Sequence, residues 1–373
     1  MVWERASRQL DLFRGLAALL MVVNHAAVAW LDRDPGVGVS AQWAEFLGSL
    51  APMLFFTATG IGCGMRRGAR AVSPATAIRK PAVLLVADAL MWAQAGRFVG
   101  LDFLGFIGIA MLSLDLLHGR ARSERLAWVV VAVVVAARFV LAPALVRFLP
   151  PELADVAAAA LGQRGMPGFS YSIFPWLAYP MLGYLLGRRF ERAEASGDGR
   201  LLVLGGLGIA ATMALHAAGA GLFRWGSLSL AFFVFGIGAG ALAWGVCGIL
   251  VDRMPRSVVD AASLRGIASL ALVPIHYAIV AAALALGWGN LRSSDAFLPA
   301  AGIAVVLAFL ISKAAATALA TAGAALPRRA VVFAAWSLAL ASLAAVLIVG
   351  SPVRTVAIVV GQLALCLLLV PRR

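Results

Sequence analysis

Twelve long stretches of apolar residues alternate with short polar segments along the whole chain. They lie near residues 12–31, 44–65, 81–98, 101–118, 126–146, 172–187, 201–222, 228–251, 263–287, 298–322, 330–350 and 353–370. A helix rises about 1.5 Å per residue, so roughly 20 apolar residues cross the ~30 Å hydrocarbon layer of a membrane. The pattern therefore predicts an all-α protein, a polytopic transmembrane helical bundle of about twelve helices.

The polar segments between these stretches are short, and none of them is expected to form a soluble domain. The longest outer segment, residues 147–171, is expected to form a short helix over the outer face. The chain shows no internal repeat of the kind found in inverted-repeat transporters. Because the last two stretches are almost purely apolar, we expect a ten-helix core in residues 1–325 and two additional transmembrane helices in residues 326–373.

Composition supports the membrane class. The chain has 373 residues, of which 62% are hydrophobic and 13% are charged, whereas a soluble protein carries about 25% charged residues. Cys63, Cys247 and Cys366 each stand alone in an apolar stretch, as small buried hydrophobes do. Their spacing predicts neither a disulfide nor a metal site, so we expect no metal cofactor.

The net charge of +14 is distributed unevenly between the two sides of the predicted bundle. If the N-terminus is cytoplasmic, the inner segments hold 21 of the 31 Lys and Arg residues, the outer segments hold 7, and 3 lie within apolar stretches. Cytoplasmic loops of membrane proteins are enriched in Lys and Arg. The distribution therefore predicts cytoplasmic termini, and it explains the positive charge without a nucleic-acid partner. We expect a multi-pass protein of a bacterial cytoplasmic membrane.

Three ionisable residues fall at similar depth within predicted membrane helices. Counted from the cytoplasmic side, His25 and His276 lie about 20 Å deep and Arg138 about 18 Å deep. Such residues are costly in a membrane and are by default candidates for function, so we expect the three to converge in one cavity. The alternatives stay open: each histidine forms an interhelical hydrogen bond, or Arg138 extends its charge towards the outer surface.

A second polar group lies at the predicted cytoplasmic ends of the first three helices. Its basic members are Arg14, Arg66, Arg67, Arg79 and Lys80. Basic residues are expected in any inner segment, but beside a cavity they also suit a phosphorylated cofactor. Asp88, Asp115 and Lys313 lie deeper on the same side and are expected to form buried pairs.

Four stretches in the order expected resemble a known family. "LDLFRGLAALLMVVNH", with Arg14 and His25, resembles the opening helix of membrane acyltransferases of the acyltransferase-3 type. "PMLFFTATGI", with Thr59, resembles that family's second helix, and "SIFPWLAYPMLGYLLGR" is similar to a helix of the heparan-α-glucosaminide N-acetyltransferase-like branch. "GIASLALVPIHYAIV" keeps the spacing from Ser269 to His276. Together they extend the resemblance over about residues 5–325.

The chain departs from the family pattern at several positions. Met53 and Leu54 stand where an acidic residue is usual, Val273 stands in place of a Tyr, and Tyr277 follows His276 in place of Trp-Pro. The segment "DRDPGVGVSAQW" lacks the histidine that is acylated in the lysosomal enzyme of the glucosaminide branch. A covalent acyl-histidine at that place is therefore excluded.

The resemblance implies transfer of an acyl group, most often acetyl, from cytoplasmic acyl-CoA to a hydroxyl or amine of a sugar, glycolipid or cell-envelope acceptor at the outer face. His25 would be the general base, His276 would orient it or bind the acceptor, and Asn24 or Thr59 would donate to the oxyanion. The basic group would hold the CoA phosphates: Arg14, Arg66, Arg67, Arg79 and Lys80. The acceptor would contact Arg138, Thr59, Trp176 and Tyr277.

Two other functions stay open at this point. A transporter or flippase without acyl chemistry would also suit a buried histidine pair in a twelve-helix protein. A non-catalytic membrane protein that has kept the fold is the third hypothesis. Stabilisation by acetyl-CoA separates the enzyme from the transporter. The identity of the acceptor, the choice between O- and N-transfer and the assembly state, for which a homodimer is one hypothesis, stay open.

Overall fold

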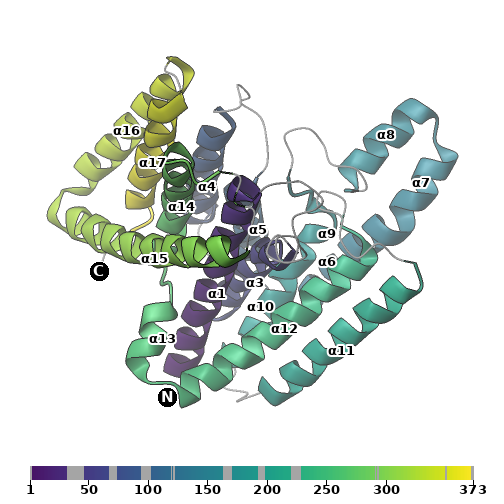
Figure 1. The fold of residues 1–373 in the computed structure, drawn as a ribbon. Coiled ribbons are helices and arrows are strands. Elements are labelled where there is room, and N and C mark those ends of the chain that lie inside the picture. The colour runs from purple at the N-terminus through teal and green to yellow at the C-terminus, as the bar shows by residue number, and fades with distance from the viewer. Residues whose placement is uncertain are drawn as a thin grey trace. The chain divides into compact units, whose positions relative to one another are not determined.

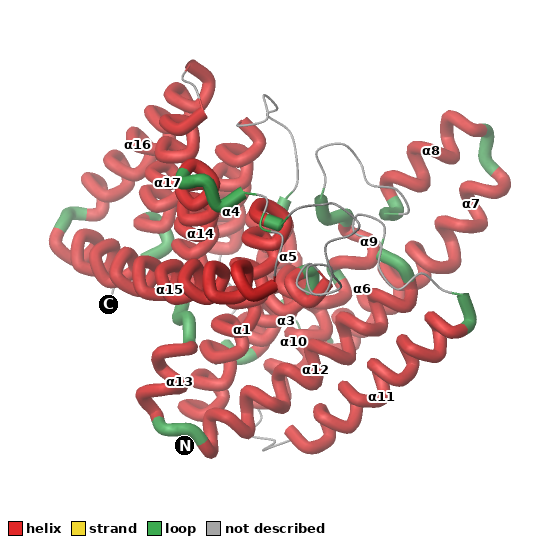
Figure 2. Tube along the Cα trace, in the orientation of Figure 1, coloured by secondary structure: helices red, strands yellow, loops and turns green. Residues whose placement is uncertain are grey.

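The computed structural model describes residues 2–31, 46–66, 74–93, 102–118, 120, 122–162, 170–191, 198–219, 228–289, 291, 294–348 and 351–370. Helices account for nearly all of these residues (Figures 1 and 2). The β pairing found within the described residues is a single bridge between Leu31 and Leu291. The predicted all-α class is therefore confirmed.

Each of the twelve predicted stretches overlaps a helix of the structure. The stretch at 126–146 covers three consecutive helical elements. The helices are α1 (Val2–Trp30), α3 (Ala51–Gly64), α4 (Pro74–Ala93), α5 (Phe103–Leu117), α6 (Ser123–Ala136) with η1 (Ala137–Leu141) and α7 (Ala142–Phe148), α10 (Ala178–Glu191), α11 (Asp198–Ala217), α12 (Leu230–Arg253), α14 (Ile267–Ala285), α15 (Ser294–Ala325), α16 (Arg328–Ile348) and α17 (Ser351–Leu367).

The helices have the length and composition of membrane spans. Among the described residues, eight helical spans are long and apolar enough to cross a membrane, while α5 and α17 are apolar but shorter. The chain is thus an integral, multi-pass membrane protein. Its orientation, and the full number of twelve crossings, stay predictions.

Three short helices lie outside the predicted membrane stretches or at their edges. The predicted helix of the 147–171 segment is α8 (Pro151–Ala160), and α9 (Ile173–Trp176) precedes α10. α13 (Arg256–Ala262), which follows Pro255, was not predicted from the sequence. Its two turns are too short to show an amphipathic period of 3.6 residues.

The chain forms two compact units, each described by itself. Unit 1 comprises Met1–Phe13, Pro52–Asp88 and Val99–Val259, and unit 2 comprises Arg14–Ala51, Ala89–Phe98 and Asp260–Arg373. Among the described residues, the chain passes between the units within α1, α3, α4 and α13.

In unit 1, small residues let helices approach closely. A side chain added to Gly183 of α10 would overlap the backbone carbonyl of Thr57 in α3, and one added to Gly60 of α3 would overlap that of Pro180. Gly64 and Gly187, each one turn further along, face each other in the same way. Such spacing of small residues is typical of helix pairs in membranes. The pair fixes α3 beside α10, while α11 lies beside α12 (Figure 1).

In unit 2, α14 packs beside both α15 and α17, and α16 packs beside α17. The second half of α1 is attached to this group at its C-terminal end. The indole of Trp30 donates to the carbonyl of Val280 at 3.3 Å, and the amide of Leu291 donates to the carbonyl of Trp30 at 2.7 Å. These bonds fix the register between α1 and α14.

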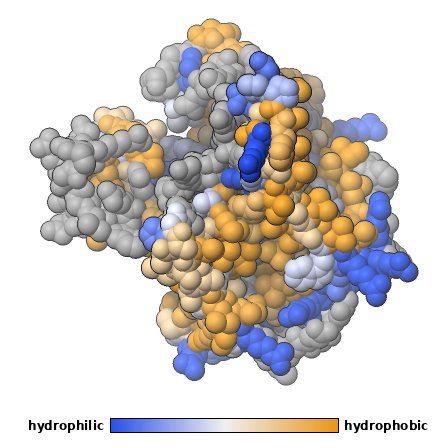
Figure 3. Space-filling view, turned by 90° about the vertical axis from the view of Figure 1, so that its right-hand side faces the viewer, coloured by the Kyte–Doolittle hydropathy of each residue, from blue (hydrophilic) through white to orange (hydrophobic). Residues whose placement is uncertain are grey.

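Many large apolar side chains face outwards. Val140, Phe148, Leu207, Leu310 and Phe333 are each more than half exposed. On the face drawn in Figure 3, hydrophobic residues form broad areas that are interrupted by patches of hydrophilic residues. Exposure on this scale suits contact with lipid and is unusual for a soluble protein. We conclude that the lipid bilayer covers this apolar surface.

Candidate functional site

The two predicted membrane histidines lie together in unit 2. His25 comes from α1 and His276 from α14, and Nδ1 of His25 lies 2.6 Å from Nε2 of His276. The two rings are nearly parallel, with an interplanar angle of 11° and centroids 4.9 Å apart. His276 is fully buried, whereas His25 is half-buried. The sequence placed these two residues at a common depth, and the structure brings their rings into contact.

The hydrogen bonds define the tautomer of each histidine. Nδ1 of His276 lies 2.9 Å from the carbonyl oxygen of Leu272, which can only accept, so Nδ1 carries the proton. In the neutral ring, Nε2 of His276 is then an acceptor, and Nδ1 of His25 donates to it. Nε2 of His25 consequently carries a lone pair, which is the state that a general base requires.

Tyr277 lies beside this lone pair. Its hydroxyl is 3.4 Å from Nε2 of His25, and its ring stacks on the His25 ring with centroids 4.7 Å apart. Tyr277 is half-buried. The residue was expected to contact the acceptor, and the structure brings its hydroxyl to the candidate base itself.

Asn24 and Arg14 belong to the same unit and the same helix as His25. Gly48 packs directly against Asn24, and a Cβ atom on Gly48 would lie 2.7 Å from the Asn24 Cα. Arg14 is half-buried and precedes His25 by three turns of α1, about 16 Å along the helix axis. Unit 2 therefore holds His25, His276, Tyr277, Asn24 and one of the predicted phosphate-binding cations.

The other predicted phosphate-binding residues belong to unit 1, except Arg67, which lies outside the described residues. Arg66 forms an ion pair with the buried carboxylate of Asp115 and also contacts Sγ of Cys63 at 3.0 Å. Burial lowers the pKa of Arg66, but the charges and hydrogen bonds of Cys63 and Asp115 outweigh it and raise that pKa above its usual value. Arg66 therefore stays charged. Arg79 and Lys80 are exposed on α4.

Asp115 was expected to form a buried pair, and its partner in the structure is Arg66, which was expected to bind phosphate. The carboxylate of Asp88 accepts from the backbone amide of Asp102 at 2.8 Å. In unit 2, the ammonium group of Lys313 donates to the backbone carbonyls of Asp260 at 2.8 Å and Ala261 at 2.5 Å. Lys313 therefore binds the last turn of α13, where a cation is favourable.

Three residues expected at the acceptor site also belong to unit 1. The buried Arg138, in the π-helical η1, donates to the carbonyl of Leu228 at 3.0 Å. Thr59 donates to the carbonyl of Phe55 one turn earlier in its own helix, at 2.9 Å. Trp176 is only 1% exposed and packs edge-on against Tyr171. Their roles towards an acceptor stay predictions.

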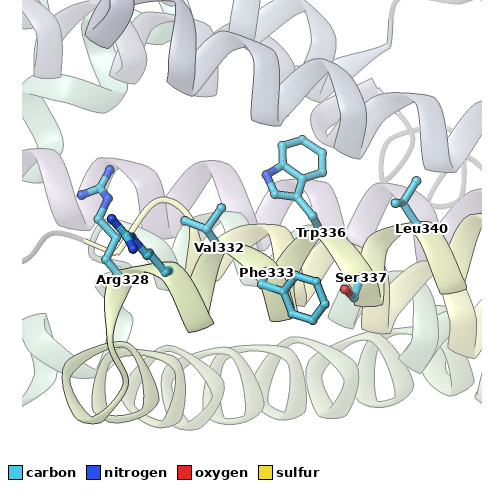
Figure 4. Close-up of a pocket in the computed structure, with 7 residues that line it drawn as sticks. Arg328, Val332, Phe333, Trp336, Ser337 and Leu340 are labelled. Carbon is cyan, nitrogen blue, oxygen red and sulfur yellow. The ribbon is translucent and has the colours of Figure 1, made fainter.

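A surface groove of about 690 Å³ lies elsewhere, along α16 (Figure 4). Arg328 lies at one end, and Val332, Trp336 and Leu340 follow along the helix. None of the predicted site residues lines this groove. Within the described part of the chain, no group of three His, Cys, Asp or Glu side chains is arranged to hold a metal ion.

One member of the histidine site, the Leu272 carbonyl, was not predicted from the sequence. The sequence did indicate that Leu272 is near His276, because residues four apart lie on the same face of a helix. The direction of the ring could not be read from spacing alone.

Comparison with known proteins identifies the family of this chain. The family model described as "Heparan-alpha-glucosaminide N-acetyltransferase, catalytic" matches residues 7–216, more than half of the chain. The match includes Asn24, His25 and the close pair of α3 and α10, and it ends before α14. No curated protein matches the chain. The chain therefore belongs to the family of the heparan-alpha-glucosaminide N-acetyltransferase catalytic domain, a family of membrane acetyltransferases.

Proposed function

We propose that this protein transfers an acyl group, acetyl by preference, from cytoplasmic acyl-CoA to a hydroxyl or amine of a sugar, glycolipid or cell-envelope acceptor at the outer face of a bacterial cytoplasmic membrane. His25 is the general base. The observation that carries the proposal is the 2.6 Å contact between His25 and His276, which leaves Nε2 of His25 as an acceptor. In this proposal, residues 1–325 form the acyltransferase core of the protein, and residues 326–373 form two additional transmembrane helices.

The proton path follows from the hydrogen bonds. Nε2 of His25 takes the proton of the attacking hydroxyl or amine, and the ring becomes an imidazolium ion. Its Nδ1–H continues to donate to His276, whose own Nδ1–H donates to Leu272. His276 thus holds His25 in one tautomer and one orientation, as the carboxylate does in a Ser-His-Asp triad. The proton then passes to the thiolate of CoA as it leaves.

The remaining predicted residues bind and orient the substrates in this proposal. The phosphates of acyl-CoA are held by Arg14, Arg66, Arg67, Arg79 and Lys80, since guanidinium and ammonium groups bind phosphate well. Asn24 or Thr59 donates to the oxygen of the tetrahedral intermediate, and this type of donation is often a large part of catalysis. Arg138, Trp176 and Tyr277 contact the acceptor.

Acetyl transfer in proteoliposomes tests the role of His25. We expect His25→Ala and His25→Gln to lower the turnover by about 10²–10⁴-fold, the usual contribution of a general base. His216→Gln is the matched control, because His216 is an exposed histidine of α11 in the other unit and its loss should leave turnover unchanged. Wild-type turnover in both His25 variants, with folded protein, would show that His25 is not the base.

Thermal unfolding separates this function from a transporter without acyl chemistry. A ligand that binds the folded state raises the unfolding temperature. We expect acetyl-CoA to raise it for the wild-type protein and for His25→Gln alike, because that substitution removes the base and leaves the phosphate-binding residues. No shift with acetyl-CoA in either protein would favour the transporter.

A further inference from the structure

A hydroxyl group of the protein itself lies beside the lone pair of the base. The Tyr277 oxygen is 3.4 Å from Nε2 of His25, and Nδ1 of His25 is bound to His276. A nucleophile within reach of a base, with the base oriented by a third group, is the structural signature of covalent catalysis. We propose that Tyr277 is the nucleophile of a two-step transfer and carries the acyl group as a tyrosine ester. This inference rests on the proposed acyltransferase function.

The position of Tyr277 favours reaction over a purely structural role. The residue follows His276 directly on α14, so the helix that orients the base also holds the phenol. The three rings of His25, His276 and Tyr277 lie in mutual contact, with centroids 4.3–4.9 Å apart. Catalytic hydrogen bonds are often long before substrate binds, which accounts for the 3.4 Å separation. Tyr277 is half-buried, not fully enclosed as its neighbour His276 is.

The first step forms the ester. The Tyr277 oxygen attacks the carbonyl carbon of acyl-CoA while Nε2 of His25 takes the phenol proton. The bond between the acyl carbon and sulfur breaks, and the proton passes from His25 to the leaving thiolate. The products are acyl-tyrosine and free CoA, and no oxidant or reductant is needed.

The second step regenerates the enzyme. The acceptor hydroxyl or amine attacks the tyrosine ester, and His25 takes its proton. The bond between the acyl carbon and the tyrosine oxygen breaks, and His25 returns the proton to that oxygen. Phenols ionise near pH 10 and thiols near pH 8.5, so a phenolate leaves almost as readily as a thiolate. An aryl ester therefore keeps most of the reactivity of the thioester.

Exchange of label between acetyl-CoA and free CoA tests the first step without an acceptor. Labelled CoA enters acetyl-CoA only if the enzyme releases CoA while it keeps the acetyl group. We expect the purified wild-type protein to catalyse this exchange, and we expect Tyr277→Phe, which keeps the ring, to lower it at least about 100-fold. Tyr179→Phe is the control: it removes a membrane phenol that donates to the carbonyl of Phe233 in unit 1, and it should exchange normally. Mass spectrometry after an acid quench should place the acetyl group on Tyr277.

Each outcome decides the matter. Absence of exchange in the wild-type protein, or exchange that persists in Tyr277→Phe, overturns the tyrosine ester. The proposed function would survive that result if transfer to acceptor is retained in Tyr277→Phe and lost in His25→Gln, because the transfer is then direct. Loss of exchange in Tyr277→Phe, with normal stabilisation by acetyl-CoA, supports the inference, since binding is then intact and only the chemistry is lost.

Discussion

At the scale of single residues, function depends on which nitrogen of each histidine carries the proton. The carbonyl of Leu272 fixes the tautomer of His276, and His276 in turn fixes that of His25. The sequence predicted the two histidines and their common depth, because helix rise alone determines depth. It could not predict the tautomers or the contact with Tyr277, since these depend on ring rotation and on the register between α1 and α14.

His276 is a positioning residue, and its substitution should affect turnover more than binding. We expect His276→Leu, which cannot accept a hydrogen bond, to lower kcat by about 10²-fold or more, since a misplaced base proton is costly. The KM for acetyl-CoA should change little. His276→Gln keeps an acceptor oxygen and should recover part of the lost kcat.

Steady-state kinetics of the two His276 variants check this expectation. Equal loss of kcat in both variants, together with a lower unfolding temperature, would indicate that His276 only fills space. Recovery in His276→Gln alone supports the positioning role.

At the scale of helices, glycines let α3 and α10 of unit 1 pack closely against each other. The apolar stretches that contain "PMLFFTATGIGCG" and "AYPMLGYLLG" predicted helices, but they did not show that Gly60 and Gly183 face each other's helix. The π-helical η1 was also not predicted, because one inserted residue in a helix leaves the apolar pattern nearly unchanged.

The same substitution at two glycines measures the contribution of this packing. Gly183→Ala would place a methyl group against the Thr57 carbonyl, and we expect it to lower the free energy of unfolding by about 1–3 kcal/mol. Gly206→Ala in α11 meets nothing within 4 Å, so it should be neutral or stabilising by up to about 1 kcal/mol. Thermal unfolding in detergent compares the two. Equal effects would show that α3 and α10 do not rely on this contact.

At the scale of the whole molecule, the apolar pattern and the charge distribution carry different information. The apolar pattern predicted an all-helical membrane protein, and the structure confirms it. The charge distribution predicts orientation, which depends on the membrane and so cannot be read from helices alone. The grouping of helices into two compact units was likewise invisible, because it depends on long-range contacts that no local pattern encodes.

Reporter fusions test the predicted orientation. A fluorescent protein that folds only in the cytoplasm should be active at the C-terminus, because the inner segments hold most of the Lys and Arg residues. An alkaline phosphatase joined after Pro150, in the predicted outer segment, should be active as well. The reverse pattern at both positions would invert the topology, and with it the side from which acyl-CoA is expected to bind.

If acyl chemistry takes place at His25, a density map of the protein in lipid with an unreactive acyl-CoA analogue should show the acyl group there. We expect the acyl carbon to lie in contact with Nε2 of His25 and the Tyr277 oxygen, within about 4 Å. We also expect the phosphates to lie on basic residues of the Arg14 and Arg66 group. An acyl carbon bound away from the histidine pair would show that His25 is not the site of the chemistry.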